Sequence, residues 1–280
     1  MATPITAALV QELRKRTDLP LMECKTALQN TEGDIEAAID WLRKNGAKVS
    51  GKRAGNETGE GRVCVYVDAA NQTAAIVELR CESAPVAKSD HFIALGTDIA
   101  KTIVDKNPLT VEALLVTEVA PGKTITDRFT DVISLLRENM KVHRFERLTE
   151  GQFGSYIHHD GSLGVVVQVT GSPADAALLR DVCMHVAAVS PTPISVTREE
   201  VPANVIAKEK EIATAKAMAT GKPQQIAEKI AEGQLNAWLK ENVLIEQPFV
   251  KDPAKTVGQL VKSAGLELKK FVRYKVGEAS

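Results

Sequence analysis

Residues 77–92 read VELRCESAPVAKSDHF and join an alternating stretch to a helical one through a short polar segment. Apolar and polar side chains alternate as far as Cys81, which is typical of a strand that is buried on one face. Pro85 suits the first turn of a helix, where no backbone N–H is needed, and Ser83 or Ala84 can cap that turn. The stretch therefore predicts a strand, a tight connection and a helix, and hence a fold that contains both kinds of element.

Glu82 to Val86 form this connection, which we call the corner. Its sequence fits two interpretations. One is an ordinary strand-to-helix connection, and the other is a loop that the fold presents at an edge to a partner. The residues of the corner alone do not distinguish these two interpretations, so the rest of the chain has to be considered.

The composition is that of a globular chain without a strong overall charge. The 280 residues are 44% hydrophobic, enough to bury a sizeable core in two or three domains. The formal net charge is -1 and only 4% of residues are aromatic, which argues against a basic field or a stacking platform for nucleic acid. The chain has no apolar run long enough to cross a bilayer and no charged-then-apolar leader. We therefore expect a cytoplasmic protein with no direct nucleic-acid or membrane partner.

The sequence lacks the motifs of common enzyme sites, such as GxxxxGK, GxGxxG, GxSxG and HExxH. The four cysteines are widely scattered and form no CxxC pair, which predicts buried, reduced thiols. His158 and His159 are adjacent, and on a strand they would point to opposite faces, unable to chelate one ion together. We expect no catalytic residue, no cofactor and no metal ion.

Residues 1–45 predict a small module of three helices, because apolar residues recur at helical spacing in three runs and Gly46 can end the third. Leu21 and Met22, in the second run, are candidates for an exposed patch that contacts a partner. The pattern fits a place in the core of the module equally well. Residues 46–60, rich in Gly, Lys and Arg, predict a flexible linker.

Residues 61–200 predict an α+β core of two related halves, because a strand hairpin followed by a helix occurs in residues 61–139 and again in residues 140–200. Residues 201–242 predict an inserted antiparallel helical hairpin with a thin seam, and residues 243–280 a last segment that returns to the core. Such a hairpin either projects towards a partner or folds over a sheet. The expected seam residues are Val205, Ile212, Ala219, Ile226, Ile230, Gly233 and Ala237.

Beyond these patterns, the chain resembles the elongation factor Ts family along almost its whole length. The resemblance begins with LVQELRKRTDLPLMECKTAL and GDIEAAIDWLRKNGA. Further stretches follow in the order of the family: KRAGNETGEG, ELRCESAPVAK, RENM, GSYIHHDGSLGVVV, MHVAA, GKPQQIAEKIAEGQL and EQPFVKDPAKTVGQLV. Together they are too long for a chance similarity.

The resemblance implies a guanine nucleotide exchange factor for elongation factor Tu, with a ubiquitin-associated-like module at the amino terminus. It also implies that the tip of the corner enters the nucleotide domain of the partner and helps to dislodge its magnesium ion. The tip residues are Ser83, Ala84, Pro85 and Val86. Family members often have Thr, Asp, Phe and Val there, so this chain lacks both the carboxylate and the aromatic ring.

We therefore expect the chain to bind elongation factor Tu, both GDP-bound and nucleotide-free, and to promote GDP release so that GTP can reload. The helical hairpin is expected to contact the partner or a second copy of this chain. The alternative is a non-enzymatic scaffold or adaptor that binds a partner through the module without exchange activity, because the tip lacks the Asp and Phe of the family. Other expected contacts with the partner are Leu21, Met22, Glu82 and His158.

Overall fold

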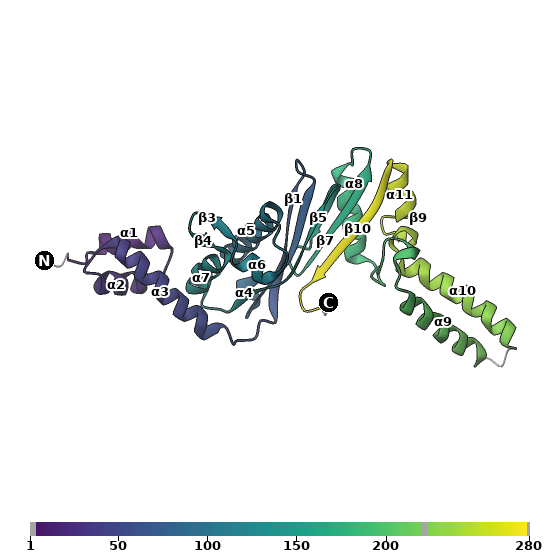
Figure 1. The fold of residues 1–280 in the computed structure, drawn as a ribbon, viewed down its shortest axis with the longest axis horizontal. Helices are drawn as coiled ribbons and strands as arrows, with labels where there is room; N and C mark the ends of the chain where they lie inside the picture. Colours follow the sequence, from purple (N-terminus) through teal and green to yellow (C-terminus); the bar gives the residue numbers. More distant parts are fainter. Residues whose placement is uncertain (1–3, 220–222, 279–280) are drawn as a thin grey trace.

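The computed structural model describes residues 4–219 and 223–278, and it confirms the α+β class (Figure 1). The body consists of two small antiparallel sheets that face each other, with helices on their outer sides. The three-helix module lies at one end of the long axis and the helical hairpin at the other. Within the described ranges, no helix is both long and apolar enough to cross a membrane.

The amino-terminal module is built from three helices around a small apolar core. Its helices are α1 (Ala7–Thr17), α2 (Leu21–Asn30) and α3 (Ile35–Arg53). The side chains of Thr6 and Asp34 cap α1 and α3, because each accepts a hydrogen bond from a backbone N–H in the first turn. The helices are held together by fully buried side chains, among them Leu13, Cys24, Leu28 and Ala38.

Helix α3 continues well past the end expected from the sequence. Gly46 does not end it: the residue is buried where α3 contacts α7 (Ile125–Leu136), and a Cβ there would come within 2.3 Å of Ser134 Oγ. This contact offsets the roughly 1 kcal/mol by which glycine disfavours a helix interior. The expected flexible linker, residues 46–60, is therefore wrong as far as Arg53, and the module is docked on the core.

The first half of the body is a three-stranded sheet with helices on its outer face. Its strands lie in the order β1-β2-β5 and all pair antiparallel. They are β1 (Glu60–Asp68), β2 (Thr73–Cys81) and β5 (Met140–Thr149). Between β2 and β5 the chain forms α4 (Ala84–Ala87), α5 (Asp90–Lys106), α6 (Val111–Leu115), β3 (Glu118–Ala120), β4 (Lys123–Thr124) and α7. Helix α5 covers β1 and β2, and its Phe92 and Leu95 share one buried cluster with Val77 and Leu79 of β2.

The second half repeats this topology. Strands β6 (Gln152–Ile157), β7 (Leu163–Gly171) and β10 (Leu266–Lys275) form an antiparallel sheet in the order β6-β7-β10, and α8 (Ala176–Ala188) covers its outer face. In each half a hairpin is followed by a helix and then by a strand that pairs with the second strand of the hairpin. The two-part core is confirmed. The expected boundary at residue 140 is wrong, because β5 pairs with β2 and completes the first sheet.

A cluster of buried charges joins the two sheets. Glu78 of β2 is fully buried, and its carboxylate accepts hydrogen bonds from Nε of Arg80 at 2.6 Å and of Arg144 at 2.7 Å. The Arg144 guanidinium lies 4.4 Å from the ring centre of Tyr274, on β10 of the other sheet. Burial raises the pKa of Tyr274 to about 12, so its ring stays neutral. Beside this cluster, buried apolar side chains from both sheets pack together, namely Val63, Ile76, Leu148, Val166 and Val272.

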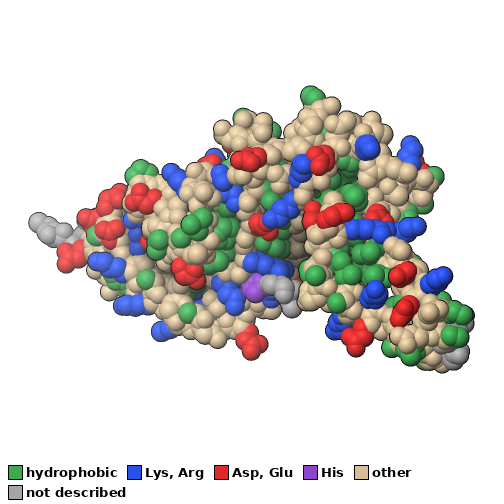
Figure 2. Space-filling model, turned by 45° about the vertical axis from the view of Figure 1, so that its right-hand side comes forward, with side chains coloured by type: hydrophobic (Ala, Val, Ile, Leu, Met, Phe, Trp, Pro, Cys, Tyr) green, Lys and Arg blue, Asp and Glu red, His purple; other side chains and the backbone are tan. Residues whose placement is uncertain are grey.

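The helical hairpin, α9 (Ala203–Met218) and α10 (Gln224–Asn242), projects from the body rather than folding over a sheet (Figures 1 and 2). Its seam is made of the buried alanines Ala213, Ala217, Ala227 and Ala231. The expected seam is only partly right, since the helices approach most closely through their smallest side chains. Half-buried members of the expected set are Val205, Ile212 and Ile230, whereas Ala219, Ile226, Gly233 and Ala237 are exposed.

A buried histidine fastens the base of the hairpin to α8. Nδ1 of His185 accepts the backbone N–H of Val250 at 3.2 Å, so Nε2 carries the proton and donates to Oε1 of Gln247 at 3.0 Å. The Gln247 side chain also donates to the backbone oxygens of Glu241 and Pro191. After this base the chain continues through β8 (Pro248–Phe249), β9 (Asp252–Thr256) and α11 (Val257–Ser263) to β10.

Acid is expected to destabilise the protein through His185. Burial lowers the pKa of His185 below its ordinary value of 6.5, so the unfolded chain takes up this proton more readily than the folded one. The stability that depends on neutral His185 is present above about pH 6.5 and is lost as the pH falls below it. Urea unfolding should therefore show a steeper loss of stability between about pH 7 and 5 for the wild type than for His185→Gln. Equal slopes would contradict this role.

Candidate functional site

The corner follows the last residue of β2 and is exposed at a single point. Helix α4 begins at Ala84, so Ser83 occupies the N-cap position, and Pro85 lies in the first turn as expected. Ser83, Ala84 and Val86 are half-buried, and Val86 packs against the core of the first half. Pro85 is exposed. The most accessible part of the tip is therefore the proline ring.

The carboxylate of Glu82 forms hydrogen bonds with other parts of the same chain. Its two oxygens accept hydrogen bonds from Nδ2 of Asn56 at 3.0 and 2.9 Å, and the backbone N–H of Asn139 donates to Oε1. The guanidinium of Arg53 lies 3.6 Å away. These contacts, the Asn139 N–H foremost, lower the pKa of Glu82 and keep it charged. Glu82 thus ties the corner to the end of α3 through contacts that lie near the surface.

Three consecutive residues after α7 hold both the corner and the module. Arg137 adopts a left-handed conformation (φ 60°) that ends α7, and its guanidinium pairs with Glu23 of α2. The Glu138 carboxylate accepts the backbone N–H of Ser83 at 3.0 Å and its hydroxyl at 2.5 Å. Nδ2 of Asn139 donates to the backbone oxygen of Asn56 at 2.8 Å. The loop therefore fixes where the corner lies relative to the module.

Arg137, Glu138 and Asn139 are not among the site residues predicted from the sequence. Their stretch, RENM, is one of those that carry the family resemblance. A signal was present, because three polar residues stand directly between an amphipathic helix and a strand. Such a short polar run at an element junction often satisfies backbone groups of a neighbouring loop.

Leu21 and Met22 lie on the surface of the module, with 41% and 70% of their area exposed. This excludes the core interpretation of their pattern, because neither residue belongs to the buried core of the module. They precede Glu23, whose carboxylate contacts Arg137. The apolar patch and the corner are therefore connected through one loop of the core.

His158 lies in the exposed turn between β6 and β7, at the same end of the body as the corner. The turn is joined to the first sheet, because the backbone N–H of Val63 donates to the oxygen of Gly161 at 2.9 Å, and Val63 pairs with Glu78, four residues before Glu82. Tyr156 Oη lies 3.0 Å from Nδ1 of His158. The expectation that His158 and His159 point apart was wrong: β6 ends before them, and their ring centres are 4.3 Å apart.

The surroundings of the cysteine thiols do not favour nucleophilic reactivity. All four cysteines are buried and unpaired, as expected. Burial raises the pKa of Cys64 to about 11 and the pKa values of Cys81 and Cys183 to about 12. At neutral pH these three side chains therefore remain thiols, which are poor nucleophiles.

The comparisons with known proteins all point to one family, and together they cover nearly the whole chain. The family described as Elongation factor TS matches residues 82–278, which begin at the corner. The protein named Elongation factor Ts from Methylococcus capsulatus is 45% identical over 276 residues, 98% of this chain and 92% of its own length. The one from Levilactobacillus brevis is 43% identical over 281 residues, 99% of this chain and 94% of its own. This chain belongs to the elongation factor Ts family of translation elongation factors.

Proposed function

We propose that this chain binds elongation factor Tu and promotes release of its GDP, with the corner as the element that disturbs the magnesium and phosphate site. The observation that carries the proposal is the geometry of the corner: Pro85 is exposed at the tip of a loop that Glu82 and Ser83 hold in place. Leu21 and Met22 supply an apolar anchor, and His158 a second contact at the same end of the body. The helical hairpin contacts the partner or a second copy of this chain.

The mechanism requires no catalytic residue. An exchange factor binds the nucleotide-free partner more tightly than the nucleotide-bound one, and linkage then obliges it to weaken nucleotide binding by the same factor. Displacing groups that hold the magnesium ion is an effective way to do so, because the ion is among the largest local charges that retain the nucleotide. The chain acts through shape and binding energy.

The shape of the corner takes the place of the missing Asp and Phe. Pro85 has a fixed φ, and the bonds of Glu82 and Ser83 order the loop before contact, so little conformational entropy is lost on binding. Glu82 contributes by positioning the loop rather than by reaching the magnesium ion. The ubiquitin-associated-like character of the module stays an expectation, as does an adaptor role without exchange activity.

Release of labelled GDP from the cognate elongation factor Tu, with and without this chain, separates the two functions. An exchange factor accelerates release at catalytic amounts. An adaptor binds the GTPase and leaves the rate unchanged, and that result would refute the proposal. Binding is followed in the same samples, so that a missing acceleration is not confused with a missing complex.

The exposed patch of the module is expected to be a binding surface. Met22→Asp and Leu21→Asp should weaken the complex with the GTPase by at least about tenfold, because each places a charge in an apolar contact that must be desolvated. Both variants should unfold at nearly the wild-type temperature, since both side chains are substantially exposed. Lys25→Asp, an exposed charge reversal on the same helix, serves as the control. Equal loss of binding by Lys25→Asp would indicate a general charge effect instead.

A further inference from the structure

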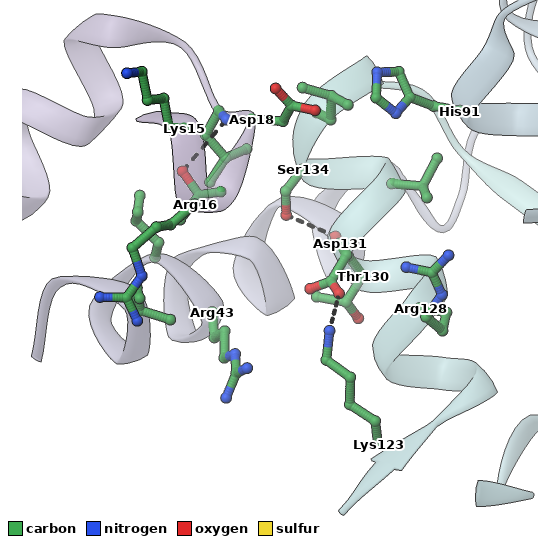
Figure 3. A pocket seen from close by; sticks show the side chains of 16 residues that line it. Lys15, Arg16, Asp18, Arg43, His91, Lys123, Arg128, Thr130, Asp131 and Ser134 are labelled. Carbon is green, nitrogen blue, oxygen red and sulfur yellow. Dashed lines mark hydrogen bonds and ion pairs between the residues drawn. The ribbon is translucent and has the colours of Figure 1, made fainter. Parts of the chain in front are cut away.

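A cavity of about 350 Å³ lies between the module and the core, on the side of α7 that faces α3 (Figure 3). Its size is within the range of sites for small molecules. Arg16 and Arg43 reach it from the module, and Lys123 and Arg128 from the core. Apolar side chains complete the lining, namely Leu19, Ile39, Leu42, Val132 and Leu135.

The lining has an excess of positive charge in a protein whose net charge is -1. Five Lys and Arg side chains are opposed by two carboxylates, Asp18 and Asp131. This differs from the face in Figure 2, where acidic and basic side chains are interspersed. The five basic residues are Lys15, Arg16, Arg43, Lys123 and Arg128.

Three of these cations are already paired. Arg16 pairs with Glu36 at 2.6 Å, Arg128 with Asp98 at 2.5 Å and Lys123 with Asp131 at 2.7 Å. None of the ion pairs in the described part of the chain involves Lys15 or Arg43. Among the described residues Arg43 thus has no ion pair, although Asp127 lies close enough for Arg43 to act on it electrostatically. Asp131 places one negative charge on the opposite wall.

We propose that this cavity binds a small anion with two or more phosphate groups at Arg43, with the paired Lys123 and Arg128 adding positive charge from the core. Guanidinium groups suit phosphate oxygens because their donors form a planar fork. The anion would contact the module and the core at once, so its binding stabilises their docked arrangement. Inorganic polyphosphate and the phosphate chain of a free nucleotide share this chemistry. The site is independent of the proposed exchange activity.

The test is calorimetric titration of the full chain with tripolyphosphate and, separately, with GTP, at low ionic strength and without the GTPase. Arg43→Gln should weaken binding about threefold to tenfold, and Asp131→Asn should tighten it by a similar factor, because each changes one charge near the ligand. Lys44→Gln is the matched control, since Lys44 is exposed beside Arg43 in the sequence but does not line the cavity. Its affinity should equal that of the wild type.

The two ligands distinguish the sources of the phosphate. Equal affinities indicate recognition of the phosphate chain alone, and tighter binding of GTP indicates that its base uses the apolar lining. Thermal unfolding of each variant checks that the fold is intact. The proposal is overturned if neither ligand binds the wild type, or if Arg43→Gln and Lys44→Gln bind equally and Asp131→Asn brings no gain.

Discussion

Glu78→Gln is expected to lower the free energy of unfolding by about 3 kcal/mol, the largest effect on stability that we expect from one substitution. The glutamine has the same shape, but it removes the negative charge that both Arg80 and Arg144 contact in a largely buried place. Removing one partner of a buried ion pair costs far more than removing an exposed pair. The Arg144 guanidinium also stacks on Tyr274, so the loss weakens the contact between the two sheets.

Urea unfolding measures this effect, and Glu267→Gln is the control. Glu267 pairs with Lys269 on the exposed side of β10, so its replacement should change the stability by less than about 0.5 kcal/mol. Similar losses for Glu78→Gln and Glu267→Gln would show that the charged cluster does not join the sheets in the way described.

Glu138→Ala is expected to slow the stimulated release of GDP by about tenfold, equivalent to roughly 1.4 kcal/mol, with a smaller effect on affinity for the nucleotide-free GTPase. The substitution removes the acceptor for both the backbone N–H and the hydroxyl of Ser83. The corner would then be less ordered before contact, because only the bonds of Glu82 remain. The added cost of ordering it appears in the step where the corner acts. Leu21 and Met22 remain in place to support binding.

Glu118→Ala provides the matched control, because Glu118 is an exposed glutamate on β3, away from the corner in the chain. It should release GDP at the wild-type rate. A tenfold loss of affinity in Glu138→Ala that fully accounts for the slower release would contradict a positioning role. Thermal unfolding of both variants separates a local effect on the corner from a global loss of the fold.

Much of the fold could be predicted from local sequence patterns. The alternation before Cys81 and the proline after it predicted the strand, the corner and the helix that follows, and all three are present. The helical hairpin was predicted from its apolar periodicity, which locates helices well because it depends only on neighbouring residues. The predicted seam was only partly right. Which of Ile226, Ala227 and Ile230 is buried depends on how closely α9 approaches α10.

The errors in the element and domain boundaries share a cause, because each boundary depends on contacts between distant parts of the chain. Gly46 stays helical because α7 lies against it, and β5 belongs to the first sheet because it pairs with β2. The corner residues were predicted from the resemblance, but their supports were not. Glu138 lies 55 residues from Ser83 in the chain, a separation that no local pattern reports.

The central claim is that the corner, which exposes Pro85 on an ordered loop, promotes the release of GDP. Stopped-flow release of labelled GDP from the cognate elongation factor Tu tests it most directly, when it is paired with affinity for the nucleotide-free form. Pro85→Gly should slow release more than it weakens binding, because glycine loosens the tip while the other contacts remain. Unchanged release by Pro85→Gly and by the Glu82→Ala, Pro85→Gly double variant would contradict the account and assign exchange to other contacts.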